Sequence, residues 1–110
     1  MSLRIPSVTH LQFLVLDALS TGERAGRELR RLLAEHGVRR TAPAFYQMMA
    51  RLEDAGLVEG RYDQKVVDGQ LLKERRYTIL RAGARALADT HNFYLSRAVG
   101  HRPVRRGSHA

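Results

Sequence analysis

The sequence predicts a single α+β domain that is mostly helical, in which three helices precede a two-stranded hairpin and one further helix. Three observations lead to this prediction. Apolar residues recur at helical spacing up to about residue 55. The pair Asp68-Gly69 is a strong signal for a two-residue hairpin turn. Helical spacing then returns after residue 80, and the length of 110 residues suits one domain with a tail.

The first two helices are expected to form most of the core. The first runs from about His10 to Leu19, with Thr9 as its N-cap, and it is apolar on nearly all sides. The second runs from about Arg24 to His36, and Gly37 suits the left-handed position after its end. Its apolar side holds Ala25, Leu29, Leu32 and Leu33, and its other side holds Arg24, Arg27, Arg30 and Arg31.

The third helix carries the most specific functional signal. Thr41 is its expected N-cap, Pro43 lies in its first turn, and it stops at Gly56. Its buried stripe is expected to consist of Phe45, Met48, Met49 and Leu52. The opposite face holds Tyr46, Gln47, Ala50 and Arg51, and no carboxylate follows until Glu53. Amides and guanidinium groups read base edges in the major groove of DNA, so we expect this helix to enter that groove.

The Asp68-Gly69 turn also sets the register of the hairpin. It pairs Val67 with Gln70, Val66 with Leu71, Arg61 with Arg76, and Val58 with Ile79. This register places Asp63 opposite Glu74 as well, and directly opposed like charges destabilise a sheet. Either a bulge shifts the ladder, or an anion lies over the two arginines. Three helices followed by a hairpin predict a winged helix-turn-helix domain with the hairpin as its wing.

Two segments are expected to make contacts beyond the core. The apolar wing tip, formed by Val66, Val67, Leu71 and Leu72, either folds back onto the body or meets a partner chain. The last helix is expected from about Arg81 to Ala98, and its apolar stripe suggests a two-fold dimer contact. The dimerisation residues are expected to be Leu87, His91, Tyr94, Leu95 and Ala98.

Composition limits the function classes. The formal net charge of +8 is concentrated after Leu80, where residues 100–110 read as a basic disordered tail that follows a domain over residues 1–99. The chain has no cysteine, its five histidines lack metal-ligand spacing, and no catalytic constellation is present. We therefore expect no enzymatic activity, no cofactor and no metal. The absence of a long apolar stretch and of a signal sequence predicts no membrane association and a cytoplasmic location.

The residues of the third helix and the wing resemble the PadR family of bacterial transcriptional regulators. The matching segments are Phe45-Tyr46, Arg51-Leu52-Glu53, Ala55-Gly56-Leu57-Val58 with Gly60, and Arg76-Tyr77 with Gly83. The resemblance implies a dimeric DNA-binding repressor with its third helix in the major groove and its wing along the backbone. The chain departs from the family pattern at Arg27, at Leu80, and in a longer wing. Only one helix follows the wing, which resembles the short members of the family and leaves any inducer open.

From these observations we expect a transcriptional regulator that acts as a repressor and binds a palindromic operator in double-stranded DNA as a homodimer. Gln47 is expected to read an adenine edge and Arg51 a guanine or a phosphate. The alternative is a winged-helix module that binds a protein partner through its wing tip and last helix and does not bind DNA. The expected DNA-contacting residues are Arg39, Arg40, Thr41, Ala44, Tyr46, Gln47, Arg51, Arg61, Lys65, Lys73, Arg75 and Arg76.

Overall fold

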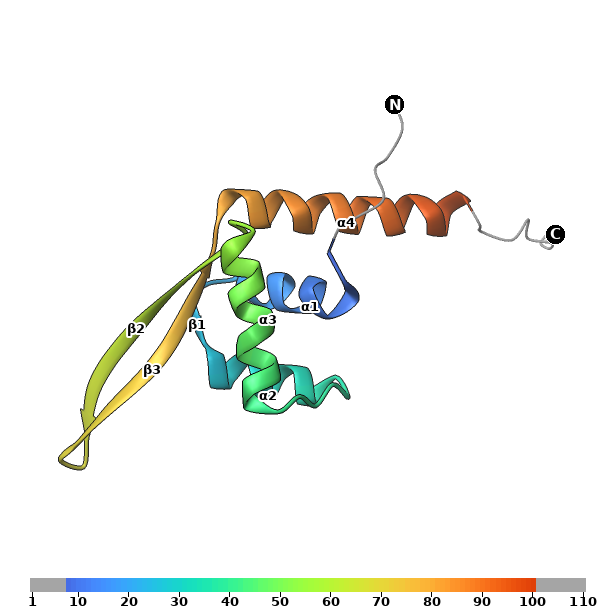
Figure 1. Cartoon of the computed structure of the whole chain (residues 1–110). Coiled ribbons are helices and arrows are strands. Elements are labelled where there is room, and N and C mark those ends of the chain that lie inside the picture. The colour runs from blue at the N-terminus through green and yellow to red at the C-terminus, as the bar shows by residue number, and fades with distance from the viewer. Residues whose placement is uncertain (1–7, 101–110) are drawn as a thin grey trace.

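The computed structural model describes residues 8–100 of the chain, and the thin grey ends in Figure 1 lie outside this range. The basic tail predicted from the sequence therefore lies outside the described residues from position 101 onward. No described helix is both long and apolar enough to cross a membrane. In order, the elements are α1 (His10–Leu19), β1 (Arg24–Ala25), α2 (Gly26–Glu35), α3 (Ala42–Asp54), β2 (Val58–Val67), β3 (Gln70–Ile79) and α4 (Arg81–Gly100).

The starts of α1 and α3 confirm the caps predicted from the sequence. The Thr9 hydroxyl accepts a hydrogen bond from the backbone N–H of Gln12, and the Gln12 side chain accepts one from the backbone N–H of Thr9. This reciprocal pair satisfies two of the donors that the first turn of a helix leaves unpaired. The Thr41 hydroxyl likewise accepts from the N–H of Ala44.

The start of α2 differs from the prediction. The helix begins at Gly26 and not at Arg24, because Arg24 and Ala25 form β1, which pairs with Tyr77 and Arg76 of β3. The sheet thus has three strands in the order β1-β3-β2, and β1 was not predicted from the sequence. A strand of two residues shows no periodicity of its own, and it exists because β3 supplies its partner.

The register predicted for the wing is confirmed over its full length, from Val58 opposite Ile79 to Val67 opposite Gln70. The turn places Asp68 at a φ of 51° and Gly69 at a φ of 77°, as a two-residue hairpin turn requires. Figure 1 shows the wing extending away from the helices. Its apolar tip does not fold back onto the body, because Val66 and Leu71 remain 69% and 65% exposed.

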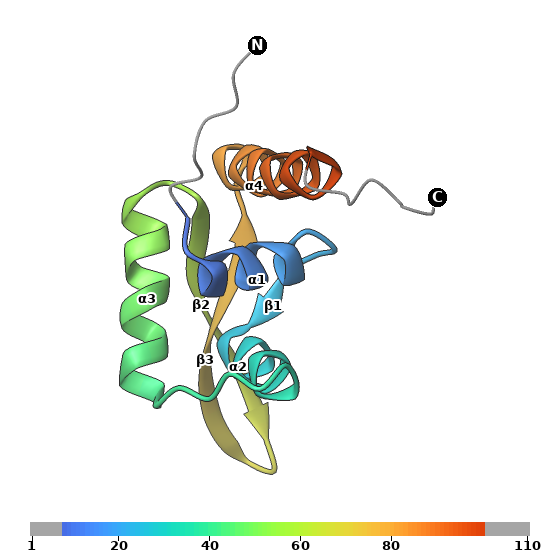
Figure 2. The ribbon, with the colours of Figure 1, turned by 90° about the vertical axis from the view of Figure 1, so that its right-hand side faces the viewer.

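The core lies where α1, α2 and α3 meet the base of the sheet. Figure 2 shows α1 in the middle, with α2 and α3 beside it. The side chain of Tyr77 on β3 is buried there, and its burial raises the pKa of the phenol to about 12. The buried core consists of Val15, Leu16, Leu19, Leu29, Leu33, Phe45, Met49, Leu52, Val58 and Tyr77. This set includes three of the four residues predicted for the buried stripe of α3, and Met48 packs partly buried against them.

The beginning of α4 is fixed against the segment that leads into β2. The backbone N–H of Leu80 donates to the carbonyl oxygen of Leu57 at 3.0 Å. Gly83 is buried one turn later, directly against the same carbonyl group. From there α4 passes over α1, as Figures 1 and 2 show, and it ends at Gly100, two residues later than the sequence predicted.

Candidate nucleic-acid interface

The helix α3 has one buried side and one exposed side. Phe45, Met49 and Leu52 are 0–1% exposed and anchor the helix in the core. The exposed side forms what we term the α3 ridge, which consists of Ala44, Gln47, Ala50 and Arg51. Because the apolar anchors fix the rotation of the helix, the amide and guanidinium groups of the ridge point to solvent. The ridge is therefore accessible to a partner molecule.

A groove lies on each side of the α3 ridge. The wing-side groove, of about 620 Å³, separates α3 from the wing and the start of α2. The α1-side groove, of about 590 Å³, separates α3 from the first turn of α1. Each groove contains cationic side chains: Arg27, Lys73 and Arg75 line the first, and Arg40 and Arg51 line the second.

Tyr46 lies on the side of α3 that faces the wing. Its side chain is 36% exposed, and its ring contacts the edge of Phe45 at a centroid distance of 5.0 Å. The hydroxyl end of the ring lies over Gly26, where an added Cβ would come within 2.6 Å of the phenol oxygen. Glycine at the start of α2 thus makes room for the tyrosine, which lines the wing-side groove with its outer edge.

Glu53, the first acid along α3, is paired within the chain. The carboxylate of Glu53 accepts a hydrogen bond of 2.6 Å from Arg75 of β3. The Arg75 guanidinium lies 4.7 Å from the ring centroid of Tyr62, and the Lys73 ammonium lies 4.9 Å from the same centroid. The ion pair between Glu53 and Arg75 joins α3 to the wing. It also reduces the repulsion that a free carboxylate of Glu53 would exert on a phosphate.

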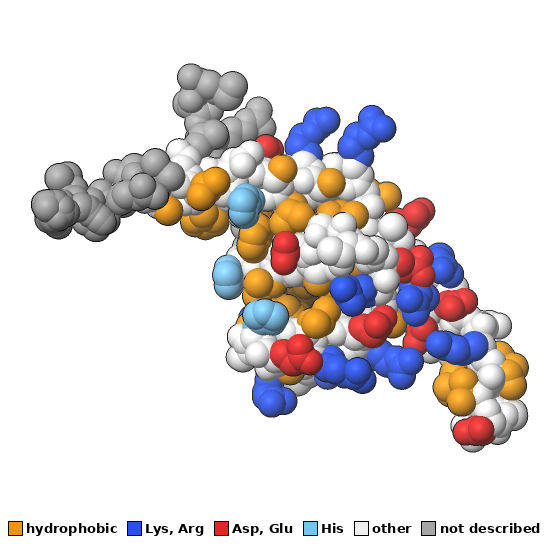
Figure 3. All heavy atoms as spheres, turned by 180° about the vertical axis from the view of Figure 1, so that it is seen from behind, with side chains coloured by type: hydrophobic (Ala, Val, Ile, Leu, Met, Phe, Trp, Pro, Cys, Tyr) orange, Lys and Arg blue, Asp and Glu red, His pale blue; other side chains and the backbone are white. Residues whose placement is uncertain are grey.

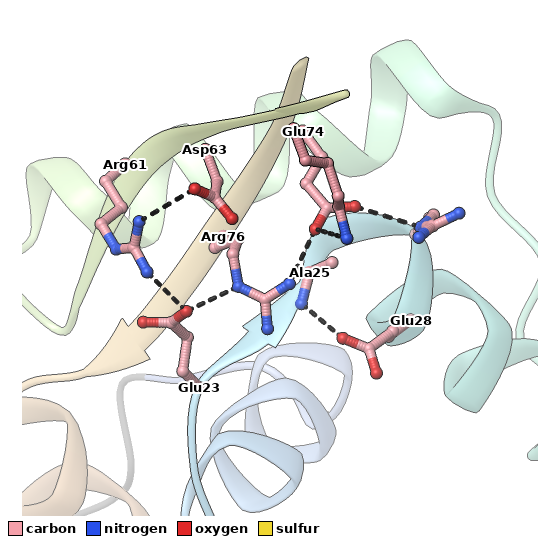
Figure 4. A network of polar contacts seen from close by, with 9 residues as sticks. Glu23, Ala25, Glu28, Arg61, Asp63, Glu74 and Arg76 are labelled. Carbon is pink, nitrogen blue, oxygen red and sulfur yellow. Dashed lines mark hydrogen bonds and ion pairs between the residues drawn. The ribbon is translucent and has the colours of Figure 1, made fainter. Parts of the chain in front are cut away.

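The opposed arginines of the wing are explained by a carboxylate from outside the hairpin. Arg61 and Arg76 face each other across β2 and β3, and no bulge interrupts these two strands. Figure 4 shows Glu23, just before β1, accepting hydrogen bonds from both arginines, at 2.8 Å and 2.6 Å. The anion predicted to lie over the two opposed arginines is therefore the carboxylate of Glu23. The like-charge pair alone no longer indicates a phosphate at this position.

A second carboxylate, Glu74, extends this network along the wing. Its oxygens lie 2.7 Å from a donor nitrogen of Arg76, 3.3 Å from one of Arg27 and 3.5 Å from the ammonium of Lys65. Arg61 also lies 3.9 Å from Asp63. Residues from α2, β2 and β3 thus share one ion-pair network. The apposition of Arg61 and Arg76 signalled an anion, but the partner could not be identified from the sequence, because Glu23 and Arg76 are 53 positions apart.

The network predicts how stability depends on pH. The hydrogen bond from Arg76 lowers the pKa of both Glu23 and Glu74 below the ordinary value of 4.5. The stabilisation from this pairing is complete above pH 4.5 and is lost as the pH falls through the lowered values. We expect the free energy of unfolding, measured in urea, to fall below pH 4.5 in the wild type. In the double variant Glu23→Gln/Glu74→Gln the free energy of unfolding should fall less over the same pH range. An equal fall in the wild type and the double variant would contradict the prediction.

The remaining residues expected to contact DNA lie next to the N-terminus of α3. Arg39 and Arg40 are exposed in the turn before the helix. The carbonyl oxygen of Arg40 accepts a hydrogen bond of 3.2 Å from Arg30 of α2, which joins this turn to that helix. Thr41 is exposed, with its hydroxyl engaged as the cap.

Most of the residues expected at a dimer contact are exposed in the single chain. Tyr94 and Leu95 are 61% and 54% exposed, and His91 and Ala98 are also exposed. Leu87 differs, because it packs partly buried against the core of its own chain. Figure 3 shows hydrophobic side chains gathered between α4 and α1 and again at the end of the wing. A groove of about 550 Å³ lies between α1 and α4.

Comparison with known proteins identifies the fold. No protein-family model matches the chain, and no curated protein is similar to it. Among solved structures, a PadR family transcriptional regulator from Eggerthella lenta is 27% identical, with a TM-score of 0.61. The match covers 79% of this chain and 76% of that one. The chain has the PadR-like winged-helix fold.

Two further structures share the PadR-like fold. PadR from Bacillus subtilis, solved in complex with operator DNA, is 23% identical, with a TM-score of 0.62 over 74% of this chain. The PadR-like chain spans 46% of the length of that protein, about half. RosR from H. salinarum is 23% identical, with a TM-score of 0.65, and the match covers 94% of this chain and 88% of RosR.

Proposed function

We propose that this PadR-like chain is a DNA-binding transcriptional regulator that acts as a repressor and binds a palindromic operator as a dimer. The observation that carries the proposal is the α3 ridge. Gln47 and Arg51 are exposed on a helix whose opposite side is locked into the core. An amide and a guanidinium are the groups that bond adenine and guanine edges in two places. The Bacillus subtilis protein of the same fold was solved in complex with operator DNA, which supports DNA binding as the function.

The two grooves beside the ridge suit the shape of a duplex. The major groove of B-DNA is about 12 Å wide and is bordered by two phosphate backbones. When the α3 ridge enters it, the two backbones lie on either side of the helix, where the wing-side and α1-side grooves are. Lys73 and Arg27 then face one backbone, and Arg40 faces the other. Phosphate contacts of this kind fix the orientation of the helix, and the ridge reads the bases.

The α4 surface supports the dimeric part of the proposal. Tyr94 and Leu95 expose large apolar side chains on the part of α4 that extends over α1. A second copy of the chain would cover this surface by a two-fold contact, in which the same patch is used by both chains. Two α3 helices would then lie about 34–36 Å apart and enter successive major grooves, which requires an operator with two related half-sites.

The salt dependence of binding tests the function. If several phosphates are contacted, the logarithm of the affinity falls linearly with the logarithm of the salt concentration, by about 0.9 per phosphate. Selection of bound fragments from random DNA by the purified chain should enrich a palindrome. The other candidate function is a protein-interaction module, which the exposed Val66 and Leu71 of the wing tip favour. A flat salt response on every duplex would support that module and contradict DNA binding.

Two variants separate the reading of bases from the holding of phosphates. In Gln47→Ala we expect the preference at one base pair to relax, with a loss of about 1–3 kcal/mol on the selected site and little change on other sequences. In Arg39→Ala we expect weaker binding to all sequences and a salt slope smaller by about one. Fluorescence anisotropy on the selected duplex and on single-base variants measures both effects. Identical behaviour of the two variants would show that the roles are wrongly assigned.

A further inference from the structure

The carboxylate of Glu74 lies at the centre of a group of three cations, of which Arg27 lines the wing-side groove together with Glu74 itself. It is 15% exposed, whereas the side chains of Arg27 and Lys65, which pair with it, are 67% and 46% exposed. The acid is therefore the inner member of the group, and the two cations are its outer members. Figure 4 shows the side chain of Glu74 reaching from β3, the strand that also carries Arg76, toward the start of α2.

Glu74 is itself held in place from behind. Arg76 donates a hydrogen bond of 2.7 Å to Glu74 and another of 2.6 Å to Glu23. Arg76 therefore lies between the two acids, with its side chain only 23% exposed. The hydrogen bond from Arg76 also lowers the pKa of Glu74, so that the carboxylate stays negative at pH values below its ordinary pKa of 4.5.

Glu74 brings together cations that would otherwise repel each other. Arg27 comes from α2, Lys65 from β2 and Arg76 from β3, and all three lie within 3.5 Å of the same carboxylate group. A guanidinium has five N–H donors and an ammonium has three, so one ion pair leaves donors on each exposed cation. Those donors are exposed beside the wing, and the donors of Arg27 lie at the edge of a groove that contains Lys73 and Tyr46.

We propose that Glu74 is a positioning residue for DNA binding, which holds Arg27 and Lys65 as a paired contact for the phosphates of a strand that passes along the wing. This inference rests on the proposed function, and it adds Arg27 to the residues expected to contact DNA. An acid at this position then strengthens the binding of a polyanion, because it orders two cations at the cost of one negative charge.

The proposal is tested by whether replacing the Glu74 carboxylate with an amide strengthens or weakens DNA binding. A carboxylate that only repels DNA weakens binding, so its replacement by an amide should strengthen binding at low salt. Glu59→Gln is the matched control, because Glu59 is exposed on the same hairpin and forms no ion pair within residues 8–100. We expect Glu59→Gln to strengthen binding slightly, and Glu74→Gln to weaken it and lower the salt slope by about one to two. The probe is a labelled mixed-sequence duplex.

A double-mutant cycle tests whether Glu74 affects DNA binding through Arg27. Arg27→Gln should lower the salt slope by about one in the wild type and should have little effect when Glu74→Gln is already present. Additive effects of the two substitutions would overturn the proposal. Thermal unfolding of each variant shows whether it is folded. If Glu74→Gln does not fold, an unchanged salt slope in Arg27→Gln alone overturns the proposal, because that side chain is mostly exposed.

The failures of the two ideas are distinguishable. If the wild-type chain shows no salt-dependent binding to any duplex, the proposed function and this inference both fail. If the wild type binds with a clear salt slope while Glu74→Gln behaves like Glu59→Gln, only the positioning role is overturned.

Discussion

Substitution of Gly83 by alanine is expected to destabilise the fold by about 3 kcal/mol, at the upper end of the usual effect of overpacking a core. A methyl group on this residue would overlap the carbonyl oxygen of Leu57 and lie 2.9 Å from Cγ1 of Ile79. The overlapping oxygen belongs to the backbone of Leu57, and it accepts a hydrogen bond from the N–H of Leu80 at the start of α4. The Leu57 carbonyl therefore cannot move without displacing α4. Urea unfolding measures the change in the free energy of unfolding.

Gly26→Ala is the matched control for this prediction. An added methyl group at Gly26 would also be too close to its neighbour, but that neighbour is the ring of Tyr46. The ring is partly exposed, so its outer end can swing toward solvent at small cost. We expect Gly26→Ala to remain much more stable than Gly83→Ala. Equal stability of the two variants would show that α4 is not fixed at the Leu57 carbonyl.

The substitution Leu95→Asp is expected to convert the proposed dimer into monomers. Burial of one leucine side chain stabilises an assembly by about 1.5–3 kcal/mol, and a two-fold contact buries two copies. Loss of both should raise the dimer dissociation constant at least about a hundredfold, before the repulsion of the new charges is counted. Sedimentation equilibrium measures the constant. Affinity for a two-site operator should fall with it, because each chain then binds one half-site alone.

Ser96→Asp is the control for the dimer prediction. It adds the same charge to the next residue of α4, which is exposed and lies outside the stripe that contains Tyr94 and Leu95. We expect this variant to stay dimeric. If Leu95→Asp is also dimeric at concentrations where the wild type is, α4 does not form the contact between chains.

The parts of the fold that the sequence predicted correctly are those with a local cause. Thr9 and Thr41 cap their helices through hydrogen bonds three residues away. The Asp68-Gly69 turn has a backbone conformation that few other residue pairs adopt, and it fixes the pairing of the whole wing. In each case the interacting groups are close in the chain, so that the sequence pattern contains the necessary information.

The parts that the sequence did not predict depend on contacts between distant segments. β1 exists because β3 lies beside it, and Glu23 acquires its role from two arginines of the wing. The apposition of Arg61 and Arg76 was a usable signal, since it required an anion, but it did not identify which one. Similarly, the exposed side of α3 followed from its apolar spacing, whereas the pairing of Glu53 with Arg75 did not.

Because β2 and β3 pair regularly, the wing can be shortened or lengthened by two residues in each strand without disturbing the pairing of the rest. Each residue of an antiparallel strand advances the chain by about 3.4 Å, close to the rise of one base pair in DNA. Deletion of two residues from each strand near the tip would retract the turn by about 7 Å and would keep every remaining side chain on its original face. A change in the hairpin alone would thus alter how far the wing reaches from the core.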